Sequence, residues 1–240
     1  MLPYTTVLPK PLLPVGERPI LAILLEQLAA AGATRIDLCV GYLGELIRAY
    51  LLETPLQLDG AEVVLHTESE PLGTAGALHE IPAIPEPFLS MNGDVLTSLD
   101  FAALMREHRE SRAALTVVVQ THETEIGSGV LELEGGRVTS YVEKPVLTHL
   151  VSLGIYALDP RALAHLPEGH VDIPTLVAEL LAAGEAVHAY HFDGYWYDIG
   201  TIGDHEAATA ELAANPHRYL SDLKPESEAK ARRDAPGSSR

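Results

Sequence analysis

The 240-residue sequence has little cysteine and no long apolar run. Cys39 is its one cysteine, which excludes an internal disulfide framework and fits a reducing compartment. No apolar stretch reaches the ~18 residues that a membrane span needs. The first residues show no basic segment followed by an apolar one, as a secretory signal would. The eleven histidines lack the Cys/His spacing of a zinc site. We therefore expect a cytoplasmic protein that has no membrane-spanning segment and no zinc site.

Basic residues are also scarce. Lys and Arg number 16 against 34 Asp and Glu, so the formal net charge is −18. Nucleic acid needs a basic face, and this balance argues against that class of partner. A small phosphorylated ligand is not excluded, because a few local cations, backbone N–H groups and a metal ion can hold it. We interpret most of the acidity as a solvated surface.

The first half of the chain alternates helix-like and strand-like segments. Such alternation predicts an α/β fold with a Rossmann-like, mostly parallel sheet flanked by helices. Ligands of such sheets bind at the carboxyl ends of the strands. The predicted strands are 35–41, 62–66, 87–91 and 115–120, and the predicted helices are 20–31, 43–52, 74–79 and 100–110.

The second half favours antiparallel pairing. Residues 130–133 and 137–143 flank Gly135-Gly136, a pair typical of a tight hairpin turn. Residues 221–240 lack apolar periodicity, so we expect a disordered tail after one domain of residues 1–220. Further strands are predicted at 151–158 and 186–192, and helices at 161–166, 173–183 and 203–214.

Two aspartates follow predicted strands. Asp94 lies in Asn-Gly-Asp after the strand that ends at Met91, and Asp198 follows the aromatic residues 195–197. Carboxylates in such places suit Mg²⁺, which takes a few carboxylates together with phosphate oxygens. The alternative is that each aspartate only caps a turn.

Two lysines each precede a proline, Lys10 in Pro-Lys-Pro and Lys144 in Glu-Lys-Pro. The proline restricts the backbone before it, which helps to aim the charge. The alternative is an ordinary surface lysine. A glycine-bearing loop, residues 70–76, leads into a predicted helix and permits close approach of a ligand, although such loops are common.

Taken together, these segments are far more specific. The ordered series PKPLLPV, EPLGTAGAL, NGDV, VEKP, SLGIYALDP and YWYDIGT resembles the sugar-1-phosphate nucleotidyltransferase family, over residues 2–214. That family includes mannose-1-phosphate guanylyltransferases and glucose-1-phosphate thymidylyltransferases. The resemblance implies the nucleotide-diphospho-sugar transferase fold and an enzyme that joins an NTP to a sugar 1-phosphate, releasing pyrophosphate.

The resemblance also implies roles for individual residues. Asp94 and Asp198 look like the pair that holds Mg²⁺ beside the nucleotide phosphates. Lys144 looks like the lysine that grips the sugar phosphate, and Glu143 is similar to the residue that contacts sugar hydroxyls. Lys10 is similar to the lysine near the reacting phosphates. One metal and two lysines would supply the charge neutralisation that in-line attack on the α-phosphorus needs.

Other positions resemble the substrate-binding loops. Gly73 and its neighbour Thr74 are similar to the base and ribose loop, and Gly129 to the glycine whose backbone faces the sugar. Glu68 or Glu70 could face a base, and a carboxylate suits guanine, whose N1–H and amino group both donate hydrogen bonds. The alternative is a solvated loop, and thymidylyl or uridylyl transfer stays open.

The sequence also departs from the family. The family begins with a strand and a Gly-rich GGxGTRL loop around the triphosphate, whereas residues 1–6 resemble those directly after it. Ser152 replaces an Asn that touches the sugar, and Ser128 replaces a Tyr. Without that strand we expect unpaired backbone edges, aggregation and little transfer. A start codon assigned too far downstream would explain the difference.

A non-catalytic sugar-nucleotide-binding subunit is the competing function. Whether the chain forms a homo-oligomer stays open.

Overall fold

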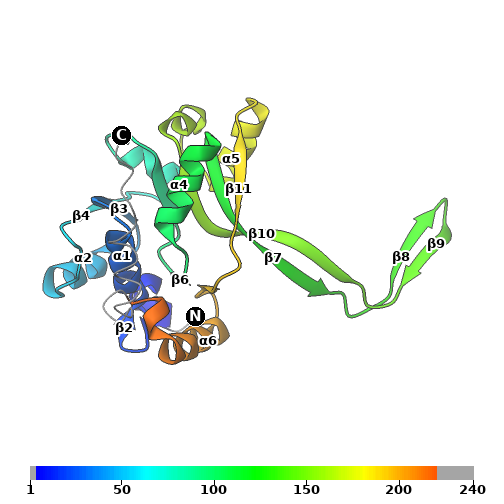
Figure 1. Cartoon of the computed structure of the whole chain (residues 1–240), viewed down its shortest axis with the longest axis horizontal. Helices are drawn as coiled ribbons and strands as arrows, with labels where there is room; N and C mark the ends of the chain where they lie inside the picture. Colours follow the sequence, from blue (N-terminus) through cyan, green and yellow to red (C-terminus); the bar gives the residue numbers. More distant parts are fainter. Residues whose placement is uncertain (1–3, 221–240) are drawn as a thin grey trace, which may run out of the picture.

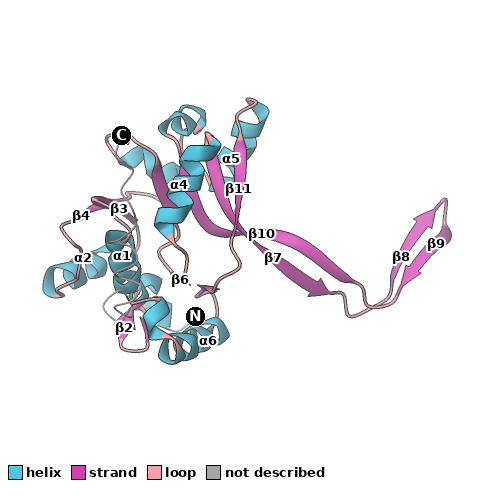
Figure 2. Ribbon diagram, viewed as in Figure 1, coloured by secondary structure: helices cyan, strands magenta, loops and turns pink. Residues whose placement is uncertain are grey.

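The computed structural model describes residues 4–220, and the predicted tail of residues 221–240 lies outside them. Figures 1 and 2 show a mixed α/β body from which one β ribbon projects. The helices are α1 (Ile20–Ala30), α2 (Gly44–Glu53), α3 (Gly73–Gly76), α4 (Phe101–Ser111), α5 (Ile173–Ala182) and α6 (Ile202–Ala214). Short 3₁₀ helices cover η1 (Tyr4–Thr6), η2 (Lys10–Leu12), η3 (Ala77–Glu80), η4 (Pro160–His165) and η5 (Pro216–Arg218).

The strands form several sheets. The strands are β1 (Pro14–Val15), β2 (Arg18–Pro19), β3 (Arg35–Val40), β4 (Glu62–Thr67), β5 (Phe88–Met91), β6 (Val95–Thr97), β7 (Leu115–Glu125), β8 (Val130–Glu134), β9 (Arg137–Val142), β10 (Val146–Leu158), β11 (Val187–His191) and β12 (Trp196–Asp198). The largest sheet has the order β11-β7-β10-β5, and the other pairs are β1-β2, β3-β4, β6-β12 and β8-β9.

The predicted α/β class is confirmed, but the largest sheet is mixed and not mostly parallel. β3 runs parallel to β4 and β11 parallel to β7, whereas β10 runs antiparallel to both β5 and β7. The reason is the connection before β10, because the β8-β9 hairpin returns the chain beside β7 without a crossover helix. Within the described residues, β3 pairs only with β4 and β5 only with β10, so each has one edge without a strand partner.

Helix α1 is buried on nearly all sides. Nine of its residues are buried, including Glu26, as expected of a helix that is apolar all round. The Glu26 carboxylate is compensated, since Arg18 contacts it at 2.6 Å and the Gln57 backbone N–H donates to it at 3.2 Å. The core beside α1 is formed by residues of β3, α2, β6 and α4.

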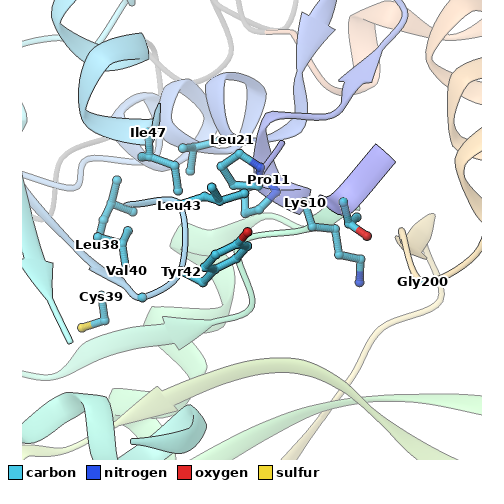
Figure 3. A pocket seen from close by; sticks show the side chains of 14 residues that line it. Lys10, Pro11, Leu21, Leu38, Cys39, Val40, Tyr42, Leu43, Ile47 and Gly200 are labelled. Carbon is cyan, nitrogen blue, oxygen red and sulfur yellow. The ribbon is translucent and has the colours of Figure 1, made fainter. Parts of the chain in front are cut away.

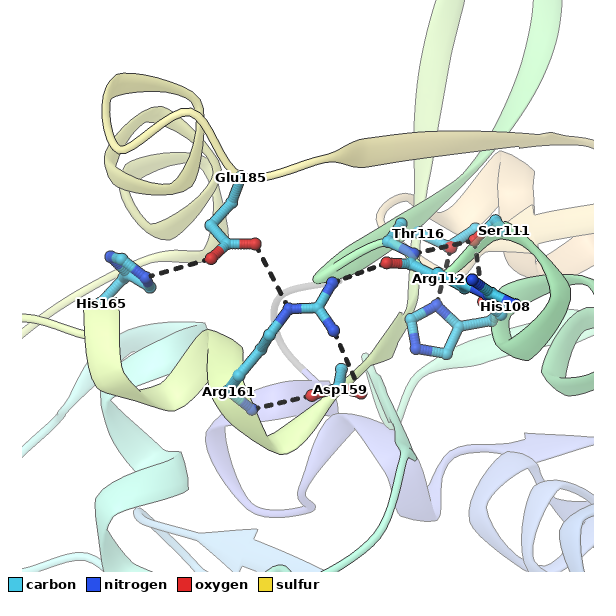
Figure 4. A network of polar contacts seen from close by, with 9 residues as sticks. His108, Ser111, Arg112, Thr116, Asp159, Arg161, His165 and Glu185 are labelled. Carbon is cyan, nitrogen blue, oxygen red and sulfur yellow. Dashed lines mark hydrogen bonds and ion pairs between the residues drawn. The ribbon is translucent and has the colours of Figure 1, made fainter.

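A network of hydrogen bonds and ion pairs surrounds Arg161 (Figure 4). Arg161 donates to the carbonyl of Arg112 at 2.6 Å and contacts Glu185 at 3.3 Å. The network thus joins η4 to the turns after α4 and α5. Nearby, the buried His108 ring shares a 2.8 Å hydrogen bond with the Thr116 hydroxyl.

Residues 121–150 form what we call the arm: the outer halves of β7 and β10 and the β8-β9 hairpin. The arm stands well away from the body (Figure 1). The predicted turn is confirmed, since Gly135 and Gly136 both have positive φ, 55° and 84°. The strands β7 and β10 are longer than their predicted ranges, because residues 121–125 pair with residues 146–150 and continue the ladder beyond the body.

Smaller differences concern helix bounds. The helix predicted at 74–79 is one α turn followed by a 3₁₀ turn, and that predicted at 161–166 is the 3₁₀ helix η4. Pro160 begins η4, with the Asp159 side chain accepting from the Arg161 N–H as a cap. None of the helices in residues 4–220 is both long and apolar enough to cross a bilayer.

Candidate active site

Three charged side chains from distant parts of the sequence meet at one point. The Lys10 ammonium nitrogen lies 2.5 Å from Asp94 Oδ2 and 3.4 Å from Asp198 Oδ1. Both carboxylates therefore face one cation, and the expected proximity of Asp94 and Asp198 is observed. No described residue outside this trio forms an ion pair with any of the three.

Backbone pairing fixes the two aspartates. β6 and β12 run antiparallel with Asp198 opposite Val95, the residue after Asp94. The Ile199 N–H also donates to the Asp94 carbonyl at 3.2 Å. Lys10 begins the 3₁₀ helix η2, which buried Leu12 anchors to the core. The charged groups of the three side chains therefore lie on short elements whose neighbouring apolar residues, Leu12, Val95 and Ile199, are buried in the core.

The charge of Lys10 is secured by its neighbours. Partial burial alone would lower the pKa of the Lys10 ammonium, but hydrogen bonds and charge from Asp94 and Asp198 outweigh it and raise the pKa. Lys10 is therefore a permanent cation at neutral pH. It cannot act as a general base there, and its chemical use is to attract and orient anionic oxygens.

A cavity of about 560 Å³ opens beside this cluster (Figure 3). Apolar residues of β3 and α2, among them Leu38, Val40 and Ile47, line one side. Lys10 lines the other side, with Gly93 before Asp94 and Gly200 after Asp198. This volume is in the range of small-molecule sites. The cavity thus combines an apolar wall with a charged rim.

Cys39 also lines the cavity. Burial, with the negative charges of Glu68 and Asp37, raises the pKa of its thiol to about 11. The thiol therefore stays protonated at neutral pH, and only the thiolate is an effective nucleophile. This argues against cysteine chemistry in the cavity.

A bulge in β10 connects the two aspartate-bearing segments. The ladder with β7 shifts register between Ser152 and Tyr156. At this bulge the Trp196 indole N–H donates to the Leu153 carbonyl at 2.9 Å, and the Asn92 backbone N–H donates to the Gly154 carbonyl at 3.1 Å. Asn92 is two residues before Asp94, and Trp196 two before Asp198. The bulge therefore helps to set how the carboxylates face each other, and exposed Ser152 lies at its start.

The glycine-bearing loop packs against the segment before α5. Thr74 donates both its N–H and its hydroxyl to Asp172 Oδ1, at 3.0 and 3.2 Å. Gly73 has φ +79°, and a Cβ there would lie 2.5 Å from the Val171 carbonyl oxygen. Glu68 accepts the Leu72 N–H at 3.2 Å. The fold thus gives Gly73 and Thr74 a packing role, whatever ligand the loop contacts.

The remaining predicted residues lie on the arm and not at the Lys10 cluster. Tyr141 donates to Glu143 Oε2 at 2.8 Å, and a Cβ at Gly129 would overlap the Tyr141 hydroxyl. Lys144 is exposed beside them, with φ 46°, a conformation that non-glycine residues rarely adopt. The site residues predicted from the sequence are therefore divided between body and arm (Figure 1).

Two carboxylates are available for a metal ion. Among the described residues no group of three or more His, Cys, Asp or Glu side chains could hold one. Mg²⁺ commonly uses only one or two carboxylates with substrate phosphates and water. The position that the Lys10 ammonium shares with both carboxylates shows that the pair accommodates a cation, so the residues fit such an ion.

Sequence reasoning missed several contributors. Asn92, Trp196 and Asp172 position the site through hydrogen bonds that depend on the folded chain. Asn92 lies in the motif NGDV and Trp196 in the motif YWYDIGT, so the motifs themselves pointed to both residues. Asp172 lies 98 residues from Thr74, and nothing in the sequence pattern pairs them.

The sequence profile of the nucleotidyl transferase family matches residues 1–215. The chain belongs to this family. Among similar proteins, the chain is 33% identical over 232 residues to a protein named mannose-1-phosphate guanyltransferase from Yarrowia lipolytica, covering 92% of this chain and 61% of that protein. It is 34% identical over 213 residues to a mannose-1-phosphate guanylyltransferase catalytic subunit beta from Drosophila pseudoobscura pseudoobscura, covering 84% and 56%.

A solved structure adds a fold comparison. HddC from Yersinia pseudotuberculosis complexed with GMP-PN superposes with a TM-score of 0.63 at 25% identity, covering 85% of this chain and 90% of that one. The chain thus spans about 60% of the length of the two guanylyltransferases it matches, but most of the length of this solved structure.

Proposed function

We propose that this chain transfers a nucleotidyl group from an NTP to a sugar 1-phosphate, with GTP as the favoured nucleotide. The observation that carries the proposal is the contact of Lys10 with both Asp94 and Asp198 at the rim of the cavity. A reaction between two phosphorylated substrates needs clustered cationic charge and metal-binding carboxylates at one point. The guanylyltransferase names of the two relatives support the choice of base.

In the proposed reaction an oxygen of the sugar phosphate attacks the α-phosphorus of the NTP. A new phosphorus–oxygen bond forms, the bond from the α-phosphorus to the β-phosphate oxygen breaks, and pyrophosphate leaves with that electron pair. Asp94 and Asp198 would hold Mg²⁺, which neutralises triphosphate charge when bound. Lys10, with its raised pKa, keeps its proton and holds anionic oxygens in line.

The other predicted residues complete the proposal. Lys144 binds the sugar phosphate and Glu143 the sugar hydroxyls, with the Gly129 backbone and Ser152 beside the sugar. The loop at Gly73 and Thr74 lies along the base and ribose, and Glu68 accepts hydrogen bonds from guanine. The single cysteine, kept as a thiol, fits the reducing cytoplasm as the compartment.

The test follows the α-phosphorus. The chain is incubated with Mg²⁺, mannose 1-phosphate and GTP labelled at the α-phosphate, beside parallel reactions with UTP, dTTP and glucose 1-phosphate. We expect whatever label is transferred to be in GDP-mannose, with pyrophosphate released in equal amount. Label in a UDP- or dTDP-sugar would show that the chain uses UTP or dTTP and not GTP. Sugar nucleotide bound without pyrophosphate release from any pair would favour the non-catalytic subunit.

A further inference from the structure

The arm exposes an unusual amount of apolar surface. Of the 30 residues from 121 to 150, none is buried and all but four are exposed. The exposed large apolar side chains of the arm are Val130, Leu131, Leu133, Val138, Tyr141, Val142, Val146, Leu147 and Leu150, nine of the sixteen in the described chain. Contiguous apolar patches of more than a few hundred Å² mark interaction sites. A two-stranded ribbon is also only marginally stable by itself.

The chain's own body is poorly placed to cover this surface. The β7-β10 ladder runs without a shift from Val146 opposite Glu125 to Ser152 opposite Val119, across the junction of arm and body. Gln120 also donates its side-chain amide to the Gly194 carbonyl at 3.0 Å, which fixes the base of the arm. Folding the arm back would break this ladder. The arm therefore continues the sheet outward, as Figure 1 shows.

The two lysines of the described residues lie on different parts of the molecule, one in the body and one on the arm. Residues 4–220 contain two lysines, Lys10 and Lys144. Lys10 is already shared by Asp94 and Asp198, whereas Lys144 has no hydrogen bond or ion pair within the described residues. The body site therefore lacks a second lysine for a second phosphate, and the arm presents one at its surface. Lys144 has a left-handed backbone with φ 46°, a strained conformation that is found often at functional positions.

We propose that two copies of this chain exchange arms, so that Lys144 of one copy completes the sugar-phosphate site beside Lys10, Asp94 and Asp198 of the other. The two-fold arrangement is reciprocal, because each copy gives an arm and receives one. It covers both apolar arms and brings Glu143 and Gly129 to the cavity together with Lys144. Interfaces of this kind take about 800 Å² from each partner, and the arm presents nine exposed large apolar side chains to such an interface. The role of Lys144 rests on the proposed function, but the exchange of arms does not.

The first test measures association without activity. Sedimentation equilibrium should show the wild-type chain as a dimer at micromolar concentration. The variant Leu131→Glu/Leu133→Glu changes exposed arm residues and should be monomeric, with an unchanged far-UV CD spectrum. The control Leu52→Glu changes an exposed leucine of α2 and should stay dimeric. A monomeric wild type, or an arm variant that stays dimeric, overturns the proposal whether or not the chain has activity.

The second test asks whether Lys144 acts in the other copy. Lys144→Ala and Asp94→Asn chains with different affinity tags are co-expressed, and the mixed dimer is purified through both tags. Exchanged arms leave one intact site of two, so the mixed dimer should have about half the wild-type activity while both parent dimers are strongly impaired. A mixed dimer no more active than its parents would show that Lys144 serves its own chain. An inactive wild type would instead contradict the proposed function and leave the sedimentation result to decide the exchange.

Discussion

Asn92 lies directly against Gly154. A Cβ built on Gly154 would approach the Asn92 side-chain nitrogen to 2.7 Å, and Gly154 has φ +67°. Only glycine therefore fits this point of the bulge without strain. Asn92 lies two residues before Asp94, and the carbonyl of Leu153, next to Gly154, accepts a hydrogen bond from the Trp196 indole N–H. The contact between Asn92 and Gly154 therefore helps to determine the positions of both carboxylates.

We predict that Gly154→Ala destabilises the fold by more than its backbone strain alone. Gly136 is the matched control, since it also has positive φ, +84°, but nothing lies within 4 Å of its built Cβ. Gly136→Ala should cost about 1 kcal/mol, and Gly154→Ala clearly more in chemical denaturation. Adding Asn92→Ala should recover part of the excess. Equal losses for the two glycine variants would show that the Asn92 contact is unimportant.

Lys10→Met should make stability depend on a divalent cation. Without the ammonium, Asp94 and Asp198 face each other as two carboxylates, which disfavours the folded chain. Mg²⁺ can replace the lost charge and should raise the melting temperature of Lys10→Met by a few degrees more than that of the wild type. Differential scanning calorimetry with Mg²⁺ and with EDTA measures this. The same Mg²⁺ response in both proteins would mean that the two carboxylates do not share a cation.

His108 should contribute to loss of stability in mild acid. Burial lowers the pKa of this histidine below its usual 6.5, an effect larger than that of nearby Asp159, which raises it. The unfolded chain therefore takes up the proton first as the pH falls through about 6.5, and stability decreases by at most about 1.4 kcal/mol per pH unit. In urea unfolding, His108→Gln should lose less stability than the wild type between pH 7.5 and 5.5. Parallel pH profiles for the two proteins would contradict this.

Much of the site could be predicted from the sequence, because the rule for strand ends is local. Asp94 follows β5 and Asp198 ends β12, and an aspartate at a strand end is a signal that the sequence shows directly. That rule does not bring the two together, because their proximity comes from the antiparallel pairing of β6 with β12. The position of the arm could not be predicted in this way. Residues 121–125 are polar and lie outside the strand predicted at 115–120, and only their backbone pairing with Val146 to Leu150 makes them strand. The role of Thr74 likewise depends on Asp172, a contact that exists only in the folded chain.

Pyrophosphate release by Asp94→Asn tests the central claim most directly. The control is Asp193→Asn, which removes the same charge from an exposed loop residue before β12. With GTP, mannose 1-phosphate and Mg²⁺, we predict that Asp94→Asn loses at least about a hundredfold in kcat/KM, equivalent to roughly 2.7 kcal/mol of transition-state stabilisation. Asp193→Asn should match the wild type, and both variants should melt near the wild-type temperature. Wild-type kcat/KM in folded Asp94→Asn would contradict the assignment of Lys10, Asp94 and Asp198 as the active site.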